Sequence, residues 1–355
     1  MPTSLLVAGI VKSVLPTLGG FREHRNAGGH TAFILDAARR RGLRTVDIGM
    51  GHYFYRGDVL VGGTRQMLTS LVSSLAVSAC NSKAVTKDLL RASGVATPRS
   101  RTFQASALDL GLEYVDSVAV PVVVKPSRGA GGQGVTCGVQ TVEELHDAWA
   151  RASEHLLPSA SILVEEHVVG IDVRAYVVAG RVVAAATRLP AYVVGDGRRS
   201  IAELVEEKSA LRARNAYLRR MEIVVDQARL GRLGMTMSSI PAADSVTVLN
   251  ETANLHQGGE NVDVTTILSE GLKDIAVRAA AAIPGLAVAG IDLLVQSLHS
   301  VEGAVVLEAN TKANISVHHL PAHGQPVDVG AALVDEMIRT APPAVEDPTP
   351  PTARD

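Results

Sequence analysis

The alternation of hydrophobic and polar positions predicts strands around one amphipathic helix at the start of the chain. Residues 4–11 form a short apolar run of strand type, and residues 31–41 repeat apolar side chains at helical spacing. Residues 43–48 have the pattern of a second strand. We therefore expect an open β-α-β layer within residues 1–80.

Beyond residue 80 the pattern becomes a succession of strands with a few longer helices. Predicted strands cover residues 121–124, 134–139, 162–165, 172–178, 182–187, 291–296 and 304–309. Predicted helices cover residues 83–92, 142–152, 201–215 and 269–283. Asn81-Ser82 and Thr141 stand where helix N-caps are favoured. From residue 341 the chain is rich in proline and is expected to hold no regular structure.

The composition is typical of an α/β protein with two or three lobes, since 46% of the 355 residues are hydrophobic and 3% are aromatic. A formal net charge of −2 gives no electrostatic reason to expect nucleic acid or an acidic membrane as a partner. Cys80 and Cys137 are expected to be reduced, with neither a disulfide nor a thiolate metal site. The N-terminus lacks a secretory pattern, and the apolar stretch at residues 279–291 is too short to span a bilayer. We expect a cytoplasmic protein.

A glycine-rich loop follows the strand that carries Lys125. Residues 126–134 read Pro-Ser-Arg-Gly-Ala-Gly-Gly-Gln-Gly, so backbone N–H groups can approach phosphate oxygens closely, and the lysine adds positive charge. The loop lacks the Gly-Lys-Ser/Thr ending of a P-loop, and a strand pattern follows it. A phosphate-binding loop is one interpretation. A glycine-rich hairpin with an exposed lysine is the other.

Acidic side chains also stand at the end of the apolar strand over residues 162–165. Glu165 and Glu166 close this strand, and Asp172 follows after Gly170. Such carboxylates can accept hydrogen bonds from an adenine amino group and a ribose hydroxyl, although carboxylates at a strand end are ordinarily solvated.

A second acidic group predicts a site for a hard cation. Glu308 and Asn310 are two residues apart and face the same side of a predicted strand, where they can converge with Asp292. Three oxygen ligands suit magnesium shared with nucleotide phosphates. His318, His319 and His323 follow without the spacing of a zinc site and are expected in loops, where a substrate contact by one of them is the alternative.

Together, these motifs resemble the ATP-grasp superfamily over roughly residues 30–325. Residues 188–197 (RLPAYVVGDG) and 252–259 (TANLHQGG) are similar to the ligase region of cyanophycin synthetases and to the glutathione-forming part of bifunctional glutamate-cysteine ligases. The resemblance implies an α/β (α+β) fold in which two α+β lobes sandwich ATP. It divides the chain into an N-terminal domain (1–80), a central lobe with a glycine-rich lid (81–166), a C-terminal lobe with the magnesium site (167–340) and a disordered tail (341–355).

The resemblance also implies roles for individual residues. The nucleotide would be bound by Lys83, Lys125, Ser127, Gly131, Gly132, Gly134, Glu165, Glu166, His167 and Asp172. The metal ligands would be Asp292, Glu308 and Asn310. Arg174 and Arg188 would face the γ-phosphate and the acyl intermediate. The implied cofactors are ATP and Mg²⁺, with Mn²⁺ as an alternative metal.

The implied activity is an ATP-dependent carboxylate–amine ligase. It would join amino acids or short peptides, with a γ-glutamyl carboxylate as one candidate, through an acyl phosphate and with release of ADP and phosphate. A small-molecule kinase and a non-catalytic ATP-binding module are the alternatives. Residues 311–315 replace the Pro or Pro-Gly turn usual in the relatives, and Asn250 stands where they usually carry arginine. A homodimer is the default expectation.

Overall fold

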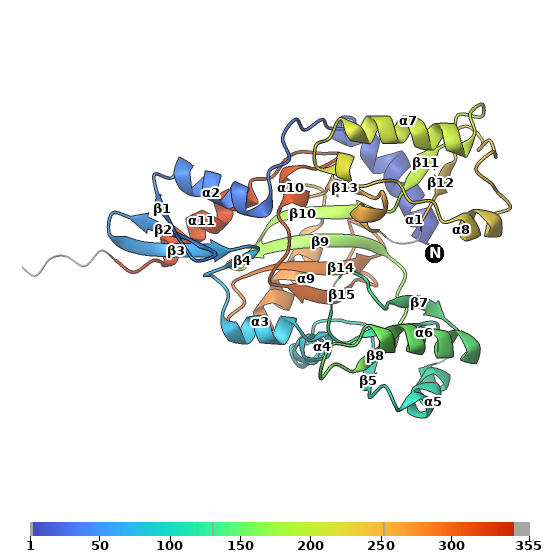
Figure 1. The fold of residues 1–355 in the computed structure, drawn as a ribbon, viewed down its shortest axis with the longest axis horizontal. Helices are drawn as coiled ribbons and strands as arrows, with labels where there is room; N and C mark the ends of the chain where they lie inside the picture. Colours follow the sequence, from blue (N-terminus) through green and yellow to red (C-terminus); the bar gives the residue numbers. More distant parts are fainter. Residues whose placement is uncertain (1–2, 119, 130, 251–252, 344–355) are drawn as a thin grey trace, which may run out of the picture.

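The described part of the chain contains three sheets of four or five strands, with helices around them (Figure 1). The computed structural model describes residues 3–343 apart from 119, 130, 251 and 252. Most of the proline-rich tail, residues 344–355, lies outside the described residues, so the prediction made for it is not tested. No helix among the described residues is both long and apolar enough to cross a bilayer.

The N-terminal segment is helical, so the strand predicted over residues 4–11 is wrong. The segment consists of α1 (Thr3–Gly9), the π-helical turn η1 (Ile10–Val14) and the 3-10 turn η2 (Leu15–Leu18). Leu6, Val7, Ile10 and Val11 are buried in the core beside the five-stranded sheet. The pairs Leu6-Val7 and Ile10-Val11 are four residues apart, so they share one face of a helix. This short apolar run therefore fits the period of a helix as well as that of a strand.

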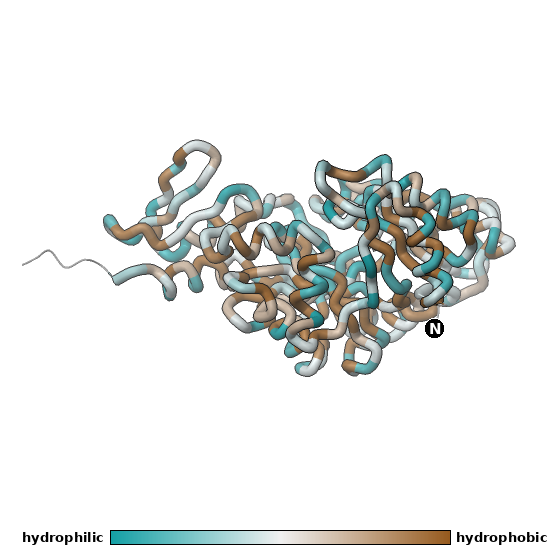
Figure 2. Tube along the Cα trace, turned by 90° about the horizontal axis from the view of Figure 1, so that it is seen from below, coloured by the Kyte–Doolittle hydropathy of each residue, from teal (hydrophilic) through white to brown (hydrophobic). Residues whose placement is uncertain are grey.

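The N-terminal layer is an antiparallel meander, which corrects the predicted β-α-β order. It consists of α2 (His30–Arg40), β1 (Arg44–Ile48), β2 (Gly51–Arg56), β3 (Val59–Arg65) and β4 (Leu68–Thr69). Gly49 and Gly57 turn the chain between strands with φ of 60° and 59°. α2 packs against α11 (Val329–Thr340), so this layer is joined to the last described helix. It projects from the rest of the molecule in two views (Figures 1 and 2).

The central lobe holds a four-stranded sheet in the order β5-β8-β6-β7. Its elements are β5 (Ser100–Phe103), α5 (Leu108–Val118), β6 (Val122–Pro126), β7 (Thr136–Val139), α6 (Val142–Glu154) and β8 (Ile162–Glu166), preceded by α3 (Ser74–Cys80) and α4 (Lys83–Ala92). The predicted caps are confirmed: the Ser82 hydroxyl accepts the N–H of Val85, and Thr141 forms a capping box with Glu144.

The C-terminal lobe is built on a five-stranded antiparallel sheet in the order β13-β10-β9-β14-β15. The strands are β9 (Ile171–Val178), β10 (Arg181–Leu189), β13 (Glu260–Asp263), β14 (Val288–Val295) and β15 (Val305–Asn310). α9 (Glu270–Ala281) packs on the face that carries Val173, Ile291 and Val306. The alternate residues of the same strands therefore face the other side, where the polar residues gather.

The remaining elements lie in the connections of this lobe. They are β11 (Tyr192–Val194), α7 (Ile201–Ala213), η3 (Leu218–Arg220), α8 (Gln227–Arg232), β12 (Val246–Val248), η4 (Leu255–Gln257) and α10 (Ser316–His319). β11 and β12 form a separate two-stranded sheet. His318 and His319 belong to α10 and are largely enclosed, whereas the sequence predicted a loop.

Buried charges connect the edge strand β13 to α7. The carboxylate of Glu260 lies 3.3 Å from Lys208 Nζ, 3.5 Å from His323 Nε2 and 3.9 Å from Arg212 Nη1. Burial alone would raise the pKa of Glu260, but the charge of Lys208, assisted by His323 and Arg212, lowers this pKa to about 2. We call these four residues the Glu260 cluster.

Replacing Glu260 with glutamine is expected to lower the free energy of unfolding by about 3 kcal/mol near neutral pH. Because the pKa of Glu260 in the folded protein is about 2 and lies below its unfolded value, the contribution is fully present above the unfolded pKa. It is lost as the pH falls through the folded pKa. Urea unfolding of both proteins between about pH 7 and about pH 3 measures this difference. A difference that does not shrink toward acid pH would rule out the ionised carboxylate as its source.

Candidate active site

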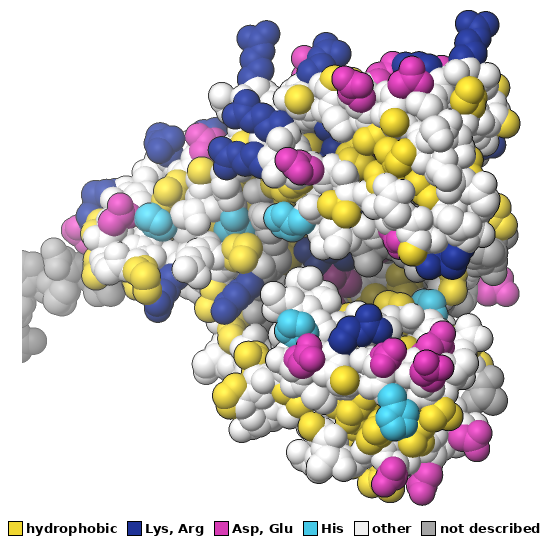
Figure 3. Space-filling view, turned by 45° about the vertical axis from the view of Figure 1, so that its right-hand side comes forward, with side chains coloured by type: hydrophobic (Ala, Val, Ile, Leu, Met, Phe, Trp, Pro, Cys, Tyr) yellow, Lys and Arg dark blue, Asp and Glu magenta, His cyan; other side chains and the backbone are white. Residues whose placement is uncertain are grey.

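A cavity of about 270 Å³ lies between the central lobe and the five-stranded sheet. Its apolar walls come from both sides and include Val123, Val135, Cys137, Ile171, Leu294 and Leu307. Lys125, Glu165, Asp172 and Arg188 contribute charged groups to the same lining. Figure 3 shows the hollow between the central lobe and the rest of the molecule, with basic and acidic side chains at its edges. Apolar walls with a few charged groups suit a flat ring that carries a charged substituent.

Two lysines from different elements hold Glu165 inside the central lobe. Lys125 on β6 donates to Glu165 Oε1, and Lys87 Nζ on α4 lies 2.8 Å from Oε2. Burial alone would raise the pKa of Glu165, but Lys125 and Lys87 keep this pKa below its ordinary value. Burial likewise lowers the pKa of Lys87, whose ammonium also donates to Thr97 Oγ1 at 2.9 Å. These three residues form one ionic cluster at the charged end of the cavity.

Lys87 was not predicted as a site residue, although the sequence contains a signal for it. It follows Lys83 by four residues and precedes the buried Leu90 by three, so it lies on the face of α4 that the protein covers. A lysine on such a face needs an acidic partner, because an unpaired buried charge is costly.

Lys83 contacts the glycine-rich loop rather than Glu165. Its Nζ donates to the carbonyl of Gly129 at 2.9 Å, and its backbone N–H donates to the carbonyl of Ser127. The Ser127 hydroxyl accepts the N–H of Ser161 at 3.0 Å, which holds the start of the loop against β8. Gly131, Gly132 and Gly134 have φ of 72°, 75° and 67°, a region that favours glycine. The loop is thus fixed at its start and shaped by glycines beyond it.

The residues after Glu165 line the cavity in different ways. The Glu166 side chain accepts from Arg99 Nε at 2.7 Å and from the Arg99 backbone N–H at 3.2 Å, a partner that sequence reasoning missed. His167 is held by its backbone N–H, which donates to the carbonyl of Pro121 at 2.8 Å. Asp172 accepts two hydrogen bonds of 2.7 Å from Arg188. Glu166 and Asp172 therefore bind arginines here, and their contacts with a nucleotide stay predictions.

The three predicted metal ligands come together on the polar face of the sheet. Asp292 on β14 is paired with Glu308 on β15, and Asn310 lies opposite Gly290. Asn310 Nδ2 donates to Glu308 Oε1 at 3.0 Å and lies 3.4 Å from Asp292 Oδ2. The described residues hold no cluster of three or more His, Cys, Asp or Glu side chains that could bind a metal. Two carboxylates and an amide oxygen nevertheless form a donor set that fits a hard cation such as Mg²⁺.

Two arginines neutralise this acidic group. Arg174 on β9 donates to both oxygens of Asp292 at 2.7 Å, and Arg188 Nη2 lies 3.4 Å from Asp292 Oδ2. Burial alone would raise the pKa of Asp292, but Arg174 and Arg188 keep it below its ordinary value. Arg188 also binds Asp172 and so connects the metal ligands to the wall of the cavity. Arg174 and Arg188 thus lie beside the predicted metal site.

His318 is buried close to Arg174. Its ring is packed edge-on against Tyr176 at a centroid distance of 5.8 Å. Burial, followed by the charge of Arg174, lowers the pKa of His318 to about 3, so the imidazole is neutral at physiological pH.

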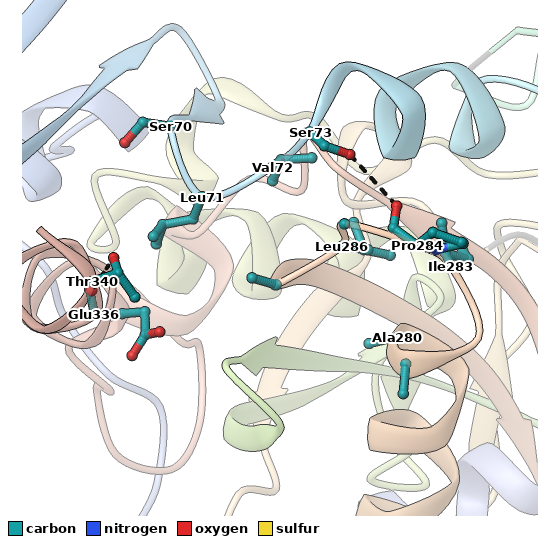
Figure 4. Close-up of a pocket in the computed structure, with 13 residues that line it drawn as sticks. Ser70, Leu71, Val72, Ser73, Ala280, Ile283, Pro284, Leu286, Glu336 and Thr340 are labelled. Carbon is teal, nitrogen blue, oxygen red and sulfur yellow. Dashed lines mark hydrogen bonds between the residues drawn. The ribbon is translucent and has the colours of Figure 1, made fainter. Parts of the chain in front are cut away.

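A second, open groove of about 620 Å³ lies where the chain passes from β4 to α3 beside the end of α9 (Figure 4). Leu71, Val72 and Leu286 line it, and the Ser73 hydroxyl donates to the carbonyl of Pro284 at 3.5 Å. Among the described residues that line it, the acid Glu336 is already paired with Arg339. This groove therefore offers no charged group for catalysis.

Comparison with known proteins identifies relatives of the chain. The family model of the carbamoyl-phosphate synthase L chain, ATP binding domain, matches residues 82–179. A cyanophycin synthetase from Trichormus variabilis is 33% identical over 322 residues, which are 88% of this chain and 35% of the relative. The glutathione biosynthesis bifunctional protein GshAB from Pasteurella multocida is 31% identical over 290 residues, which are 79% of this chain and 37% of that protein.

Structural comparison agrees with these matches. The crystal structure of a bifunctional glutathione synthetase from Pasteurella multocida superposes with a TM-score of 0.63 at 27% identity, covering 87% of this chain and 43% of that one. The chain spans about a third of the length of the curated relatives it matches. The matched ATP-binding region contains Lys83, the glycine-rich loop, and Lys125 and Glu165, which line the cavity. The chain therefore belongs to the ATP-grasp superfamily, as its sequence motifs predicted.

Proposed function

We propose that the chain is an ATP-dependent ligase that forms a peptide or isopeptide bond between amino acids or short peptides. One observation carries the proposal: the metal-ligand set and the two arginines beside it adjoin a cavity whose other end holds Lys125 and Glu165. The relatives support it, because a cyanophycin synthetase and glutathione-forming proteins are both among them.

The chain's own residues suggest how ATP would be held. The apolar walls suit the base, while Lys83, Lys125 and the backbone N–H groups of the glycine-rich loop suit the phosphates. Asp292, Glu308 and Asn310 would hold Mg²⁺, or Mn²⁺ in its place, which neutralises charge on phosphate oxygens. Such a site works mainly by positioning reactants and stabilising charge.

The proposed reaction needs no covalent nucleophile from the protein. A substrate carboxylate attacks the γ-phosphate and ADP leaves, which yields an acyl phosphate. The amine then attacks the acyl carbon, phosphate departs, and the amine loses a proton. Arg174 and Arg188, which bind Asp292 and Asp172, would stabilise the negative charge of both steps. The glycine-rich loop would exclude water, which otherwise hydrolyses the acyl phosphate.

Incubation with ATP, Mg²⁺ and a panel of amino acids and dipeptides tests the proposal. We expect ADP and phosphate in equal amounts, released only when both an acid and an amine are present, with a condensed product detected by mass spectrometry. AMP and diphosphate would exclude the acyl-phosphate route. A stable phosphorylated product formed without amine would indicate a kinase, and ATP binding without turnover would indicate a regulatory module.

The remaining features of this proposal are an amino-acid or peptide substrate, a cytoplasmic location and a homodimer. The substrate class follows from the expected ligase chemistry, whereas the location and the homodimer are expectations from the sequence and from the usual assembly of such enzymes. Light scattering on the purified protein tests the homodimer, which predicts a molar mass twice that of the 37.2 kDa chain.

A further inference from the structure

Lys87 is a buried charged residue that the proposed reaction does not use. Its side chain is fully enclosed, and its ammonium donates to Thr97 Oγ1 at 2.9 Å and to the carbonyl of Pro98 at 3.4 Å. Lys125, in contrast, lines the proposed nucleotide cavity with a side chain that is 11% exposed. A ligand in the cavity can therefore contact Lys125, whereas Lys87 can act on that ligand only through its charge.

The two lysines share one carboxylate. Glu165 Oε2 lies 2.8 Å from Lys87 Nζ, while Oε1 accepts a hydrogen bond from Lys125. If Lys125 were the only partner of Glu165, the two charges would cancel and the pair would attract phosphate weakly. Lys87 supplies a second positive charge to the same carboxylate, so the cluster keeps one unit of positive charge. Lys125 is the cation of the cluster that lines the cavity.

The other charged side chains in the cavity lining do not cancel this excess. Glu166 is paired with Arg99, and Asp172 accepts two hydrogen bonds of 2.7 Å from Arg188. Each of these pairs is neutral. Together with the ionic cluster, three carboxylates therefore face four cations, and the additional cation is Lys87.

Charged groups beyond the lining have partners of their own. Asp292 is held by Arg174 with two hydrogen bonds of 2.7 Å, and Glu308 belongs to the proposed metal-ligand set. Lys83 donates to the carbonyl of Gly129 and would add its charge to that of Lys125. Lys87 therefore determines whether the end of the cavity formed by Lys125 and Glu165 is neutral or positive.

We propose that Lys87 is a positioning residue for nucleotide binding. It neutralises Glu165 from behind, so that the charge of Lys125 is free to attract the phosphates of the nucleotide. Lys87 itself contacts neither the base nor a phosphate. This inference rests on the proposed ATP site and extends it to a residue that lies outside the cavity.

Calorimetric titration of the full chain with ADP and with adenosine, both in the presence of Mg²⁺, separates a charge effect from a structural one, because the ligands differ only in two phosphates. In Lys87→Met we expect ADP to bind about tenfold more weakly and adenosine to bind as in the parent protein. Lys208→Met also removes a buried lysine beside a carboxylate, that of Glu260, and should leave ADP binding unchanged. Equal weakening of both ligands in Lys87→Met, or unchanged ADP binding, would overturn the proposal.

The double variant Lys87→Met/Glu165→Gln should reverse the loss. It removes one positive and one negative charge, so the ratio of ADP affinity to adenosine affinity should return to about the parent's value. Glu165→Gln alone leaves two cations and should raise the ratio above that value. The difference between Glu165→Gln and the double variant measures the effect of Lys87 even if Lys87→Met does not fold. A double variant with the low ratio of Lys87→Met would refute the assignment.

The parent protein distinguishes this inference from the proposed function. If it binds ADP but ligates no substrate pair, the ligase proposal fails, while the affinity ratios still decide the role of Lys87. If it does not bind ADP, the proposed nucleotide site and the role of Lys87 are both wrong.

Discussion

Replacing Glu308 with glutamine is expected to reduce ATP-dependent turnover by about a thousandfold, because removing one carboxylate from the metal-ligand set forfeits several kcal/mol of charge stabilisation. Glutamine keeps the shape of the side chain and can still accept the hydrogen bond that Asn310 donates at 3.0 Å. The fold should therefore persist while the charge is lost. ADP release with a substrate pair found in the panel measures the effect.

A matched control distinguishes loss of the ligand from a general effect of the substitution. Glu302→Gln makes the same change at an exposed position just before β15 and should leave turnover unchanged. Circular dichroism and a thermal melt should be alike for both variants and the parent protein. Full activity of Glu308→Gln at low Mg²⁺ concentration would remove Glu308 from the metal site.

Asp292 gives a less selective test of the same site. Asp292→Ala should also abolish turnover, but it removes the partner that Arg174 binds with two hydrogen bonds of 2.7 Å. An unpaired buried arginine costs about 3–5 kcal/mol, so a loss of activity could reflect partial unfolding. Glu308 is the better position because its neighbour Asn310 is uncharged.

The elements that sequence predicted correctly have local determinants. Residues 83–92 form a helix whose Ser82 cap and apolar face lie within a few residues of one another, and β9 and β10 are joined by a turn at Ala179-Gly180. β2 and β3 were missed because Gly51, Gly62 and Gly63 interrupt the strand pattern, and glycine within a strand weakens that signal. Their pairing depends on packing against α11, which lies far along the chain.

In the candidate site, too, the local features could be predicted from the sequence, whereas contacts between distant residues could not. Spacing placed Glu308 and Asn310 on one face of a strand, and the structure brings them to Asp292. Sequence could not show which cation neutralises which carboxylate, because the partners are distant along the chain. Arg99 reaches Glu166 across 67 positions, and Arg174 reaches Asp292 across 118. Such pairs follow from sheet order and register, which the local pattern does not encode.

The ionic cluster of Lys87, Glu165 and Lys125 gives the second large effect. Glu165→Gln is expected to lower the free energy of unfolding by about 3–5 kcal/mol, because it leaves two ammonium groups in the interior without their shared carboxylate. The Lys87 side chain is fully buried, whereas that of Lys125 is 11% exposed. The cost should therefore come mainly from Lys87.

A second substitution should restore much of this loss. In Lys87→Met/Glu165→Gln the deeper cation is gone, and Lys125 can turn toward solvent, so the double variant should be more stable than Glu165→Gln alone. Urea unfolding of the parent, both single variants and the double variant gives the coupling energy directly. Glu166→Gln, whose partner Arg99 is exposed, serves as the control and should cost less than about 1 kcal/mol. If the two losses simply add in the double variant, Lys87 and Glu165 do not depend on each other for stability, and the low pKa of Glu165 must rest on Lys125 alone.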